Sequence, residues 1–269
     1  MQEPQGLPTY EVFAVRYAER DGWRRNAFQG GDPHDGPLGM DYFVWAIRNA
    51  ERTYVVDLGF TEAIAAKRKR NYIRSPRTGL AMIGVDAATV TDVVISHMHY
   101  DHVGTYADFP QARFHVQEDE MDYATGKYMK YGRFRHGYEV DDVVGMVRLV
   151  YDQRVQFHDG ADEIAPGISV HRIGGHTQGC QCVRVHTQRG WVVLASDCSH
   201  YYENFEKNRP YSSLFNVGEQ ADGFETMRRL ASSERHIVPG HDPLVMKRYP
   251  AAAKELDGIV VRLDVEPGE

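Results

Sequence analysis

Hydrophobic and polar residues form short, regular patterns along the chain, and most of these patterns predict strands. Residues 10–18 alternate with the period of two that places successive side chains on opposite faces of a strand. Two further runs, 42–47 and 53–56, flank a short polar connection and predict a β-hairpin. The apolar run 93–95 predicts a short buried strand.

Helical patterns are interspersed with further strands in both halves of the chain. Residues 61–70 are rich in Ala, Lys and Arg and follow the N-cap candidate Thr61, which predicts a helix. Helices are also expected at 118–123 and 219–231, and strands at 113–117, 168–173, 181–186, 191–195 and 236–238. This mixture predicts an α/β protein with two packed sheets and helices outside them.

Residues 123–140 have a different pattern, in which aromatic side chains alternate with Lys and Arg. The pattern fits either a lid over a pocket or a helix that buries one aromatic face. Both interpretations remain open at this point.

The segment that follows the strand at 93–95 has the highest concentration of candidate metal ligands in the chain. Residues 97–102 have the pattern H-x-H-x-D-H. His97 and His99 are two residues apart, so an extended backbone points both rings the same way, and Asp101 and His102 then turn in a second direction. Imidazole and carboxylate groups bind zinc and other divalent first-row metals, so one loop offers ligands to two adjacent ions.

Three more strand-like runs end in side chains that bind metals. His176 follows a pair of glycines that let the backbone bend sharply, Asp197 ends the run 193–196, and His241 follows Gly240. Loops at strand ends converge on a rigid scaffold, so we expect these groups to gather around the histidine loop.

Composition narrows the functional classes. The chain has 269 residues and a formal charge of −7, which does not favour binding to nucleic acid. Its three cysteines, Cys180, Cys182 and Cys198, are too few and too odd for a disulfide framework and fit a reducing cytoplasm; packing is the expected role of Cys198. The N-terminus shows no signal peptide and no apolar run approaches membrane-spanning length, so we expect a cytoplasmic protein.

The order of these motifs resembles the metallo-β-lactamase superfamily, from about Asp41 to His241. The matching motifs are Asp57-Leu58-Gly59, H-x-H-x-D-H, Gly175-His176-Thr177-x-Gly179, Ser196-Asp197 and Gly240-His241. The resemblance implies one hydrolase domain over residues 1–269 with the αββα four-layer sandwich, two mixed sheets with helices outside. It also implies two divalent metal ions, zinc first and iron, manganese or cobalt as alternatives. Their ligands would be His97, His99 and His176 for one ion, Asp101, His102 and His241 for the other, and Asp197 as a bridge.

Within the superfamily, the chain is most similar to the N-acyl-homoserine lactonases. The resemblance rests on the segment 197–206, on Pro210-Tyr211, on the continuation of the histidine loop into Val103-Gly104, and on Asp242. It implies a hydrolase in which metal-activated water opens a lactone ring, with Asp101 moving the proton and Asp57 orienting a ligand histidine. The family has a tyrosine three residues after the bridging aspartate, whereas this chain has His200 there. His200, Tyr201 and Tyr202 are therefore the candidates for donating a hydrogen bond to the oxyanion.

Other functions on the same ligand set stay open. They are a thioesterase, an aromatic-lactone hydrolase, a phosphodiesterase, and a single-iron persulfide dioxygenase that would need only His97, His176 and Asp197. The expected partner is a small lactone, with a homodimer possible and no membrane or nucleic acid. We expect the segment 123–140 to contact the apolar part of the substrate, with Phe28, Met40 and Tyr42 as further candidates.

Overall fold

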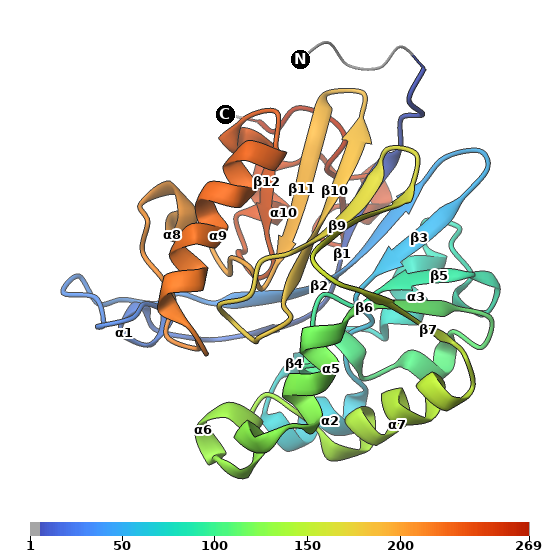
Figure 1. Cartoon of the computed structure of the whole chain (residues 1–269). Helices are drawn as coiled ribbons and strands as arrows, with labels where there is room; N and C mark the ends of the chain where they lie inside the picture. Colours follow the sequence, from blue (N-terminus) through green and yellow to red (C-terminus); the bar gives the residue numbers. More distant parts are fainter. Residues whose placement is uncertain (1–5, 269) are drawn as a thin grey trace.

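Two β-sheets form the centre of the computed structural model, which describes residues 6–268 (Figure 1). The first sheet has the order β13 (Val260–Arg262), β1 (Glu11–Arg20), β2 (Met40–Arg48), β3 (Thr53–Val56), β5 (Asp92–Val94), β6 (Arg113–Gln117) and β7 (Val155–His158), with β4 (Asn71–Tyr72) paired to β1. The second has the order β12 (Ile237–Pro239), β11 (Gly190–Ser196), β10 (Gln181–Thr187), β9 (Ile168–Arg172) and β8 (Ala161–Ala165). Both sheets are mixed, since β3, β5, β6 and β7 run parallel, as do β11 and β12.

Helices cover the outer face of each sheet, which confirms the predicted αββα sandwich (Figure 1). On the side of the first sheet lie α2 (Glu62–Arg68), α3 (Pro76–Ala81), α5 (Glu118–Thr125), α6 (Gly132–Arg135) and α7 (Val140–Tyr151). The short helix α4 (Tyr100–Val103) belongs to the same core, through Tyr100 and Val103. On the side of the second lie α8 (Tyr202–Glu206) and α9 (Val217–Leu230), while α10 (Val245–Arg248) contacts β13 at the edge of the first sheet and α1 (Arg24–Ala27) lies in the connection between β1 and β2.

Strands of the first sheet are apolar on both faces because each face packs against a different layer. In β2, Phe43 and Trp45 belong to the core between the sheets, whereas Tyr42 and Val44 belong to the core under the helices. Alternation along a strand sends neighbours to opposite faces, so one strand supplies both cores.

The predicted elements are confirmed, with small shifts at their ends. Thr61 caps α2 as expected, because its hydroxyl accepts a hydrogen bond from the backbone N–H of Ile64. The sequence analysis did not predict α1, α3, α4, α7, α8, α10, β4, β7, β8 or β13. The segment 123–140 is not one helix: it contains the end of α5, a 3₁₀ turn at Lys127–Lys130 and α6.

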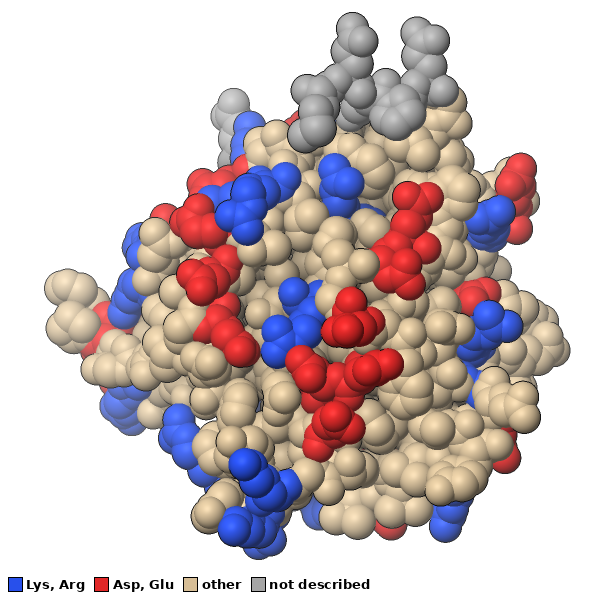
Figure 2. Space-filling view, in the orientation of Figure 1, with Lys and Arg blue, Asp and Glu red and all other residues tan. Residues whose placement is uncertain are grey.

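The three cysteines are buried and carry free thiols, with the sulfur atoms of Cys180 and Cys198 3.5 Å apart. Within residues 6–268 no helix has the length and apolar character needed to cross a membrane. The predicted absence of a signal peptide concerns residues 1–5, which lie outside the described part. On the face in Figure 2, acidic and basic side chains are intermixed.

Candidate metal centre

The predicted ligands lie at the ends of strands that converge on one edge of the sandwich. His97 follows β5, His176 follows β9, Asp197 follows β11 and His241 follows β12. Sharp backbone turns aim these side chains inward: Gly175 has φ +80° and packs so closely that an added Cβ would lie 2.8 Å from the Cα of Gln220. Only glycine fits that conformation and that space.

The structure brings all seven predicted ligands into one buried cluster. Four overlapping groups each have their ligand atoms within 4.8 Å of one another: His97, His99 and His176; His97, His102 and Asp197; Asp101, His102 and His241; and His176, Asp197 and His200. Segments nearly 150 residues apart in sequence therefore meet at one point. The histidine loop contributes to three of the four groups.

Asp197 divides this cluster into two sides. Its Oδ2 lies 3.2 Å from Nε2 of His176 and 3.8 Å from Nε2 of His97. Its Oδ1 lies 2.8 Å from Nε2 of His241 and 3.4 Å from Nε2 of His102. Each carboxylate oxygen thus faces a different set of imidazoles, which is the arrangement that a carboxylate bridging two cations requires.

Hydrogen bonds on the outer side of the rings fix which nitrogen faces the centre. The Nδ1–H of His102 donates to Asp57, that of His176 to the carbonyl of Ser213, and that of His241 to the carbonyl of Asp41, at 2.8, 2.7 and 2.8 Å. Each bond turns Nε2 of its ring toward the centre of the cluster. The geometry therefore gives Asp57 the orienting contact that the resemblance implied.

Asp57 also ties the two sheets together beneath the ligands. Its carboxylate accepts hydrogen bonds from the backbone N–H and hydroxyl of Ser96 and from the hydroxyl of Ser196, at 2.8, 2.9 and 2.8 Å. Ser96 precedes His97 and Ser196 precedes Asp197 in the chain. One buried carboxylate thus positions ligands from both sheets.

The protonation preferences separate the two sides. Burial lowers the pKa of His97 and His99 well below the usual value, and that of His176 to about 3, so these rings are neutral near pH 7. For His102 burial opposes the charged form, but the carboxylates of Asp57, Asp197 and Asp101 outweigh burial and raise the pKa to about 10. The acidic side of the cluster therefore favours a positive charge at its centre.

The donor set fits divalent metal ions. Nε2 of His97, Nε2 of His102 and Oδ1 of Asp197 are buried and have no hydrogen-bond partner within residues 6–268. Buried polar atoms without a partner are costly unless something else satisfies them. The rings of His97, His99 and His176 are neutral, and at His102 a bound metal ion would take the place of the proton; imidazoles and a carboxylate that converge in this way are the ligands that zinc and similar ions take.

Glu120 in α5 supports the same cluster and was missed by the sequence analysis. It is fully buried, and its Oε1 accepts hydrogen bonds from the backbone N–H of Met98 at 2.8 Å and the hydroxyl of Tyr138 at 3.0 Å. Its Oε2 accepts from the hydroxyl of Thr177 at 2.5 Å and the backbone N–H of Gly179 at 3.2 Å. Glu120 therefore joins the loop of His97 and His99 to the loop of His176.

The three candidate donors after Asp197 differ in position. Nε2 of His200 lies 2.9 Å from Oδ2 of Asp197, and its ring stacks on Tyr211 with the centroids 3.6 Å apart. The hydroxyl of Tyr201 donates to the carbonyl of Gly39 at 3.4 Å. The ring of Tyr202 is buried in the hydrophobic core, 6.0 Å from the ring of Phe205. Of the three, His200 is the one in a candidate ligand group.

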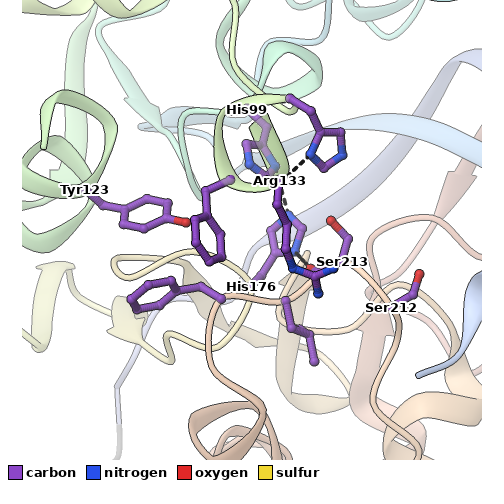
Figure 3. A pocket seen from close by; sticks show the side chains of 10 residues that line it. His99, Tyr123, Arg133, His176, Ser212 and Ser213 are labelled. Atoms are coloured by element: carbon purple, nitrogen blue, oxygen red, sulfur yellow. Dashed lines mark hydrogen bonds between the residues drawn. The ribbon is translucent and has the colours of Figure 1, made fainter. Parts of the chain in front are cut away.

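A cavity of about 280 Å³ opens beside His99 and His176 (Figure 3). Tyr123, Phe134 and Phe215 form an aromatic wall, with Phe215 4.9 Å and 5.7 Å from the other two rings. The cavity thus includes part of the segment 123–140. Among the further candidates for substrate contact, Phe28, Met40 and Tyr42, Tyr42 lies next to a proposed ligand: its ring packs 5.1 Å from the ring of His241.

Comparison with known proteins places this geometry in a family. Residues 39–251 match the family model described as "Metallo-beta-lactamase superfamily". The chain belongs to the metallo-beta-lactamase superfamily. The family prediction is confirmed, and the matched region contains every residue of the cluster.

Individual superfamily members resemble the chain more distantly. An N-acyl homoserine lactonase from Bacillus sp is 27% identical over 165 residues, which cover 61% of this chain and 60% of that protein. N-acyl homoserine lactonase AiiB from Agrobacterium fabrum is 28% identical over 123 residues, 44% of each chain. The chain thus matches about 60% or less of the length of these curated relatives.

Solved structures show the same fold over most of the chain. A quorum-quenching N-acyl homoserine lactone lactonase superposes with a TM-score of 0.73 at 19% identity and covers 88% of this chain and 94% of its own. AidC, a dizinc quorum-quenching lactonase, superposes with a TM-score of 0.66 at 14% identity and covers 88% and 89%. At this identity the likeness establishes the superfamily fold.

Proposed function

We propose that this chain, as one domain, is a metal-dependent hydrolase that opens a lactone ring, an N-acyl-homoserine lactone or a related cyclic ester. The observation that carries the proposal is the position of Asp197, whose two oxygens face two separate sets of imidazoles. Its relatives named as lactonases support the reaction class. Zinc is the proposed metal, since the donors are imidazoles and carboxylates.

The proposed ligands follow the two sides of Asp197. His97, His99 and His176 would hold one ion, Asp101, His102 and His241 the other, and Asp197 would bridge them. Two bound divalent ions would supply Lewis acidity, which polarises an ester carbonyl and acidifies a water molecule. The single-iron dioxygenase would leave Asp101, His102 and His241 without a function, so the hydrolase is favoured.

The chain's own groups would handle protons and position the substrate. Asp101 has its Oδ2 3.6 Å from Nε2 of His102 and 3.8 Å from Nε2 of His241, so it lies where it can accept a proton and return it to the leaving oxygen. His200 is the proposed donor to the substrate carbonyl, because stacking on Tyr211 holds its ring against Asp197. Tyr201 and Tyr202 stay as predicted alternatives for that donor.

A metal analysis combined with a substrate panel tests the proposal. The purified protein should contain close to two metal ions per chain and hydrolyse short- and long-chain acyl-homoserine lactones in a pH-stat assay. His102→Ala should fold but lose turnover on the order of a thousandfold or more, since even one lost transition-state donor costs about 10²–10³. His34→Ala, at an exposed loop histidine, is the matched control.

Three results would contradict the proposal. A fully active His102→Ala variant would exclude the two-metal scheme. Hydrolysis of thioesters or aryl phosphates in preference to every lactone would replace the lactonase by another hydrolase of the same fold. Oxygen consumption with one iron per chain would indicate the dioxygenase.

A further inference from the structure

The cavity beside the metal centre has an uneven chemical lining. Arg133, His136 and Ser213 are among its polar lining residues, and Tyr123, Phe134 and Phe215 form its aromatic wall. Figure 3 shows Tyr123 on one side of the cavity and Arg133 with Ser213 away from it. No carboxylate is among the described residues that line it, so Arg133, whose side chain is exposed, gives the lining a positive charge. A pocket built for a neutral acyl chain has no need of such a charge.

The guanidinium of Arg133 is exposed at the mouth of this cavity and is unpaired in the described part of the chain. Within residues 6–268 its guanidinium takes part in neither a hydrogen bond nor an ion pair, and its backbone carbonyl accepts a hydrogen bond from Nδ1–H of His136 at 2.8 Å. Other arginines around the metal centre are engaged, such as Arg68, which pairs with Glu139 at 2.8 Å. An unpaired guanidinium in a concave site offers a planar pair of donors that matches a carboxylate.

The size of the cavity limits what the carboxylate is attached to. A volume of about 280 Å³ lies just below the range for small-molecule sites, about 300–1,000 Å³. It suits a ring and a short substituent better than a long acyl chain. The aromatic wall would contact the ring while His99 and His176 mark the side from which the metal centre is reached.

We propose, building on the proposed lactonase function, that the preferred substrate is a compact lactone that carries a carboxylate, and that Arg133 binds this carboxylate. Arg133 is then a specificity-determining residue, which orients the ring so that its ester faces the metal centre. The reaction itself is unchanged: water adds to the ester carbonyl, the ring C–O bond breaks, and the leaving oxygen takes up the proton.

A matched pair of substrates tests the assignment. The carboxylate of γ-butyrolactone-γ-carboxylic acid and its neutral carboxamide have the same ring and nearly the same size. The wild-type protein should have a kcat/KM for the carboxylate at least about tenfold above that for the amide, because a charge-assisted bidentate contact contributes that much. Arg133→Gln should abolish this preference, mainly by raising KM for the carboxylate, and Arg133→Lys should restore part of it.

Arg135 supplies the control, since it lies on the same short helix and lines the neighbouring cavity with Val140 and Val143. Arg135→Gln should keep the wild-type preference. An unchanged ratio in Arg133→Gln, or a wild-type preference for the amide, would overturn the assignment while leaving the lactonase function intact.

Equilibrium binding separates this inference from the reaction. The ring-opened product of the carboxylate substrate is 2-hydroxyglutarate. Isothermal titration calorimetry can measure the binding of this product without any turnover. We expect Arg133→Gln to weaken it about tenfold or more relative to wild type and to Arg135→Gln. If no lactone is hydrolysed but this difference remains, the proposed function fails and the carboxylate site stands; if the affinities are equal, the site is excluded.

Discussion

Two groups of buried histidines in this protein differ in what their ring nitrogens contact. In one, His115 and His158 stack on neighbouring strands, with Nδ1 of His115 2.9 Å from Nε2 of His158. Their outer nitrogens face Asp92 at 3.2 Å and Asp162 at 2.8 Å, so every nitrogen of the pair has a partner. In the metal centre, by contrast, the inner nitrogens of His97 and His102 are buried without a hydrogen-bond partner.

The contrast separates a structural role from a ligand role. A satisfied imidazole pair needs nothing further, whereas several free lone pairs that converge on one carboxylate need a cation to be stable. Burial alone does not distinguish the two groups, since His115 and His158 are 6% and 4% exposed and His97 is 0% exposed. The decisive property is which atoms point at one another.

Substituting one carboxylate in each group gives the largest contrast. Asp197→Asn should lower kcat/KM on the order of a thousandfold or more and reduce the metal content below two ions per chain, because an amide is a poor bridge between two cations. Asp92→Asn should keep activity and metal content and lower the free energy of unfolding by about 0.5–1.5 kcal/mol. Lactone hydrolysis, metal analysis and urea unfolding measure these differences.

Equal activity losses in the two variants would contradict the distinction between the groups. A fully active Asp197→Asn protein with two bound metals would exclude Asp197 as the bridge. Circular dichroism is needed as a control, so that a loss of folding is not taken for a loss of metal.

A smaller effect is expected for Asp57, which contacts ligands without belonging to the proposed donor set. Asp57→Asn keeps the size of the side chain but can no longer accept from His102 and both serines at once. Partners of this kind typically contribute about 10- to 100-fold to metal affinity. Competition with a chromophoric chelator should therefore show weaker binding by that factor, with little change in secondary structure; unchanged affinity would assign Asp57 to turn formation alone.

The sequence predicted those elements whose own pattern of apolar and polar residues shows which of their faces are buried. Strands such as β1 and β2 are apolar along most of their length because both of their faces are buried, and such an apolar run is visible locally. The edge strand β8, with the sequence Ala-Asp-Glu-Ile-Ala, is mostly exposed and shows no such pattern. Helix α7 is rich in valine, which favours strands locally, so its helical conformation depends on packing that one sequence does not show.

The residues of the candidate site also fall into two groups, those that a local sequence pattern predicts and those that it does not. The ligands in the histidine loop were predicted from spacing within six residues, and His176, Asp197 and His241 from their places after strands. Glu120 gave no signal, because its partner Thr177 lies 57 residues away and the contact exists only in the folded chain. Residues that support a site through distant contacts are therefore the part that the sequence alone does not supply.

Glu120→Gln should have an effect on stability more than on chemistry. The amide oxygen of the glutamine can still accept two of the four hydrogen bonds. Its NH₂ group, however, would face the backbone N–H of Gly179, which is a donor and cannot become an acceptor. One unsatisfied buried donor costs about 1–3 kcal/mol in the free energy of unfolding. Urea unfolding should show this loss for Glu120→Gln and less than about 0.5 kcal/mol for Glu118→Gln, an exposed position in the same helix.

The smallest effect is expected for a substitution in the hydrogen-bonded pair of His115 and His158. His158→Gln removes the imidazole that contacts His115 and Asp162, and the side chain of Asp162 is 57% exposed. Exposed ion pairs contribute little, so the free energy of unfolding should fall by only about 1 kcal/mol, chiefly from the lost imidazole contact. Metal content and lactone turnover should equal those of wild type, because no atom of this pair belongs to a candidate ligand group. A loss of bound metal in His158→Gln would show that the two histidine groups are coupled, and satisfied nitrogens would then no longer identify a purely structural role.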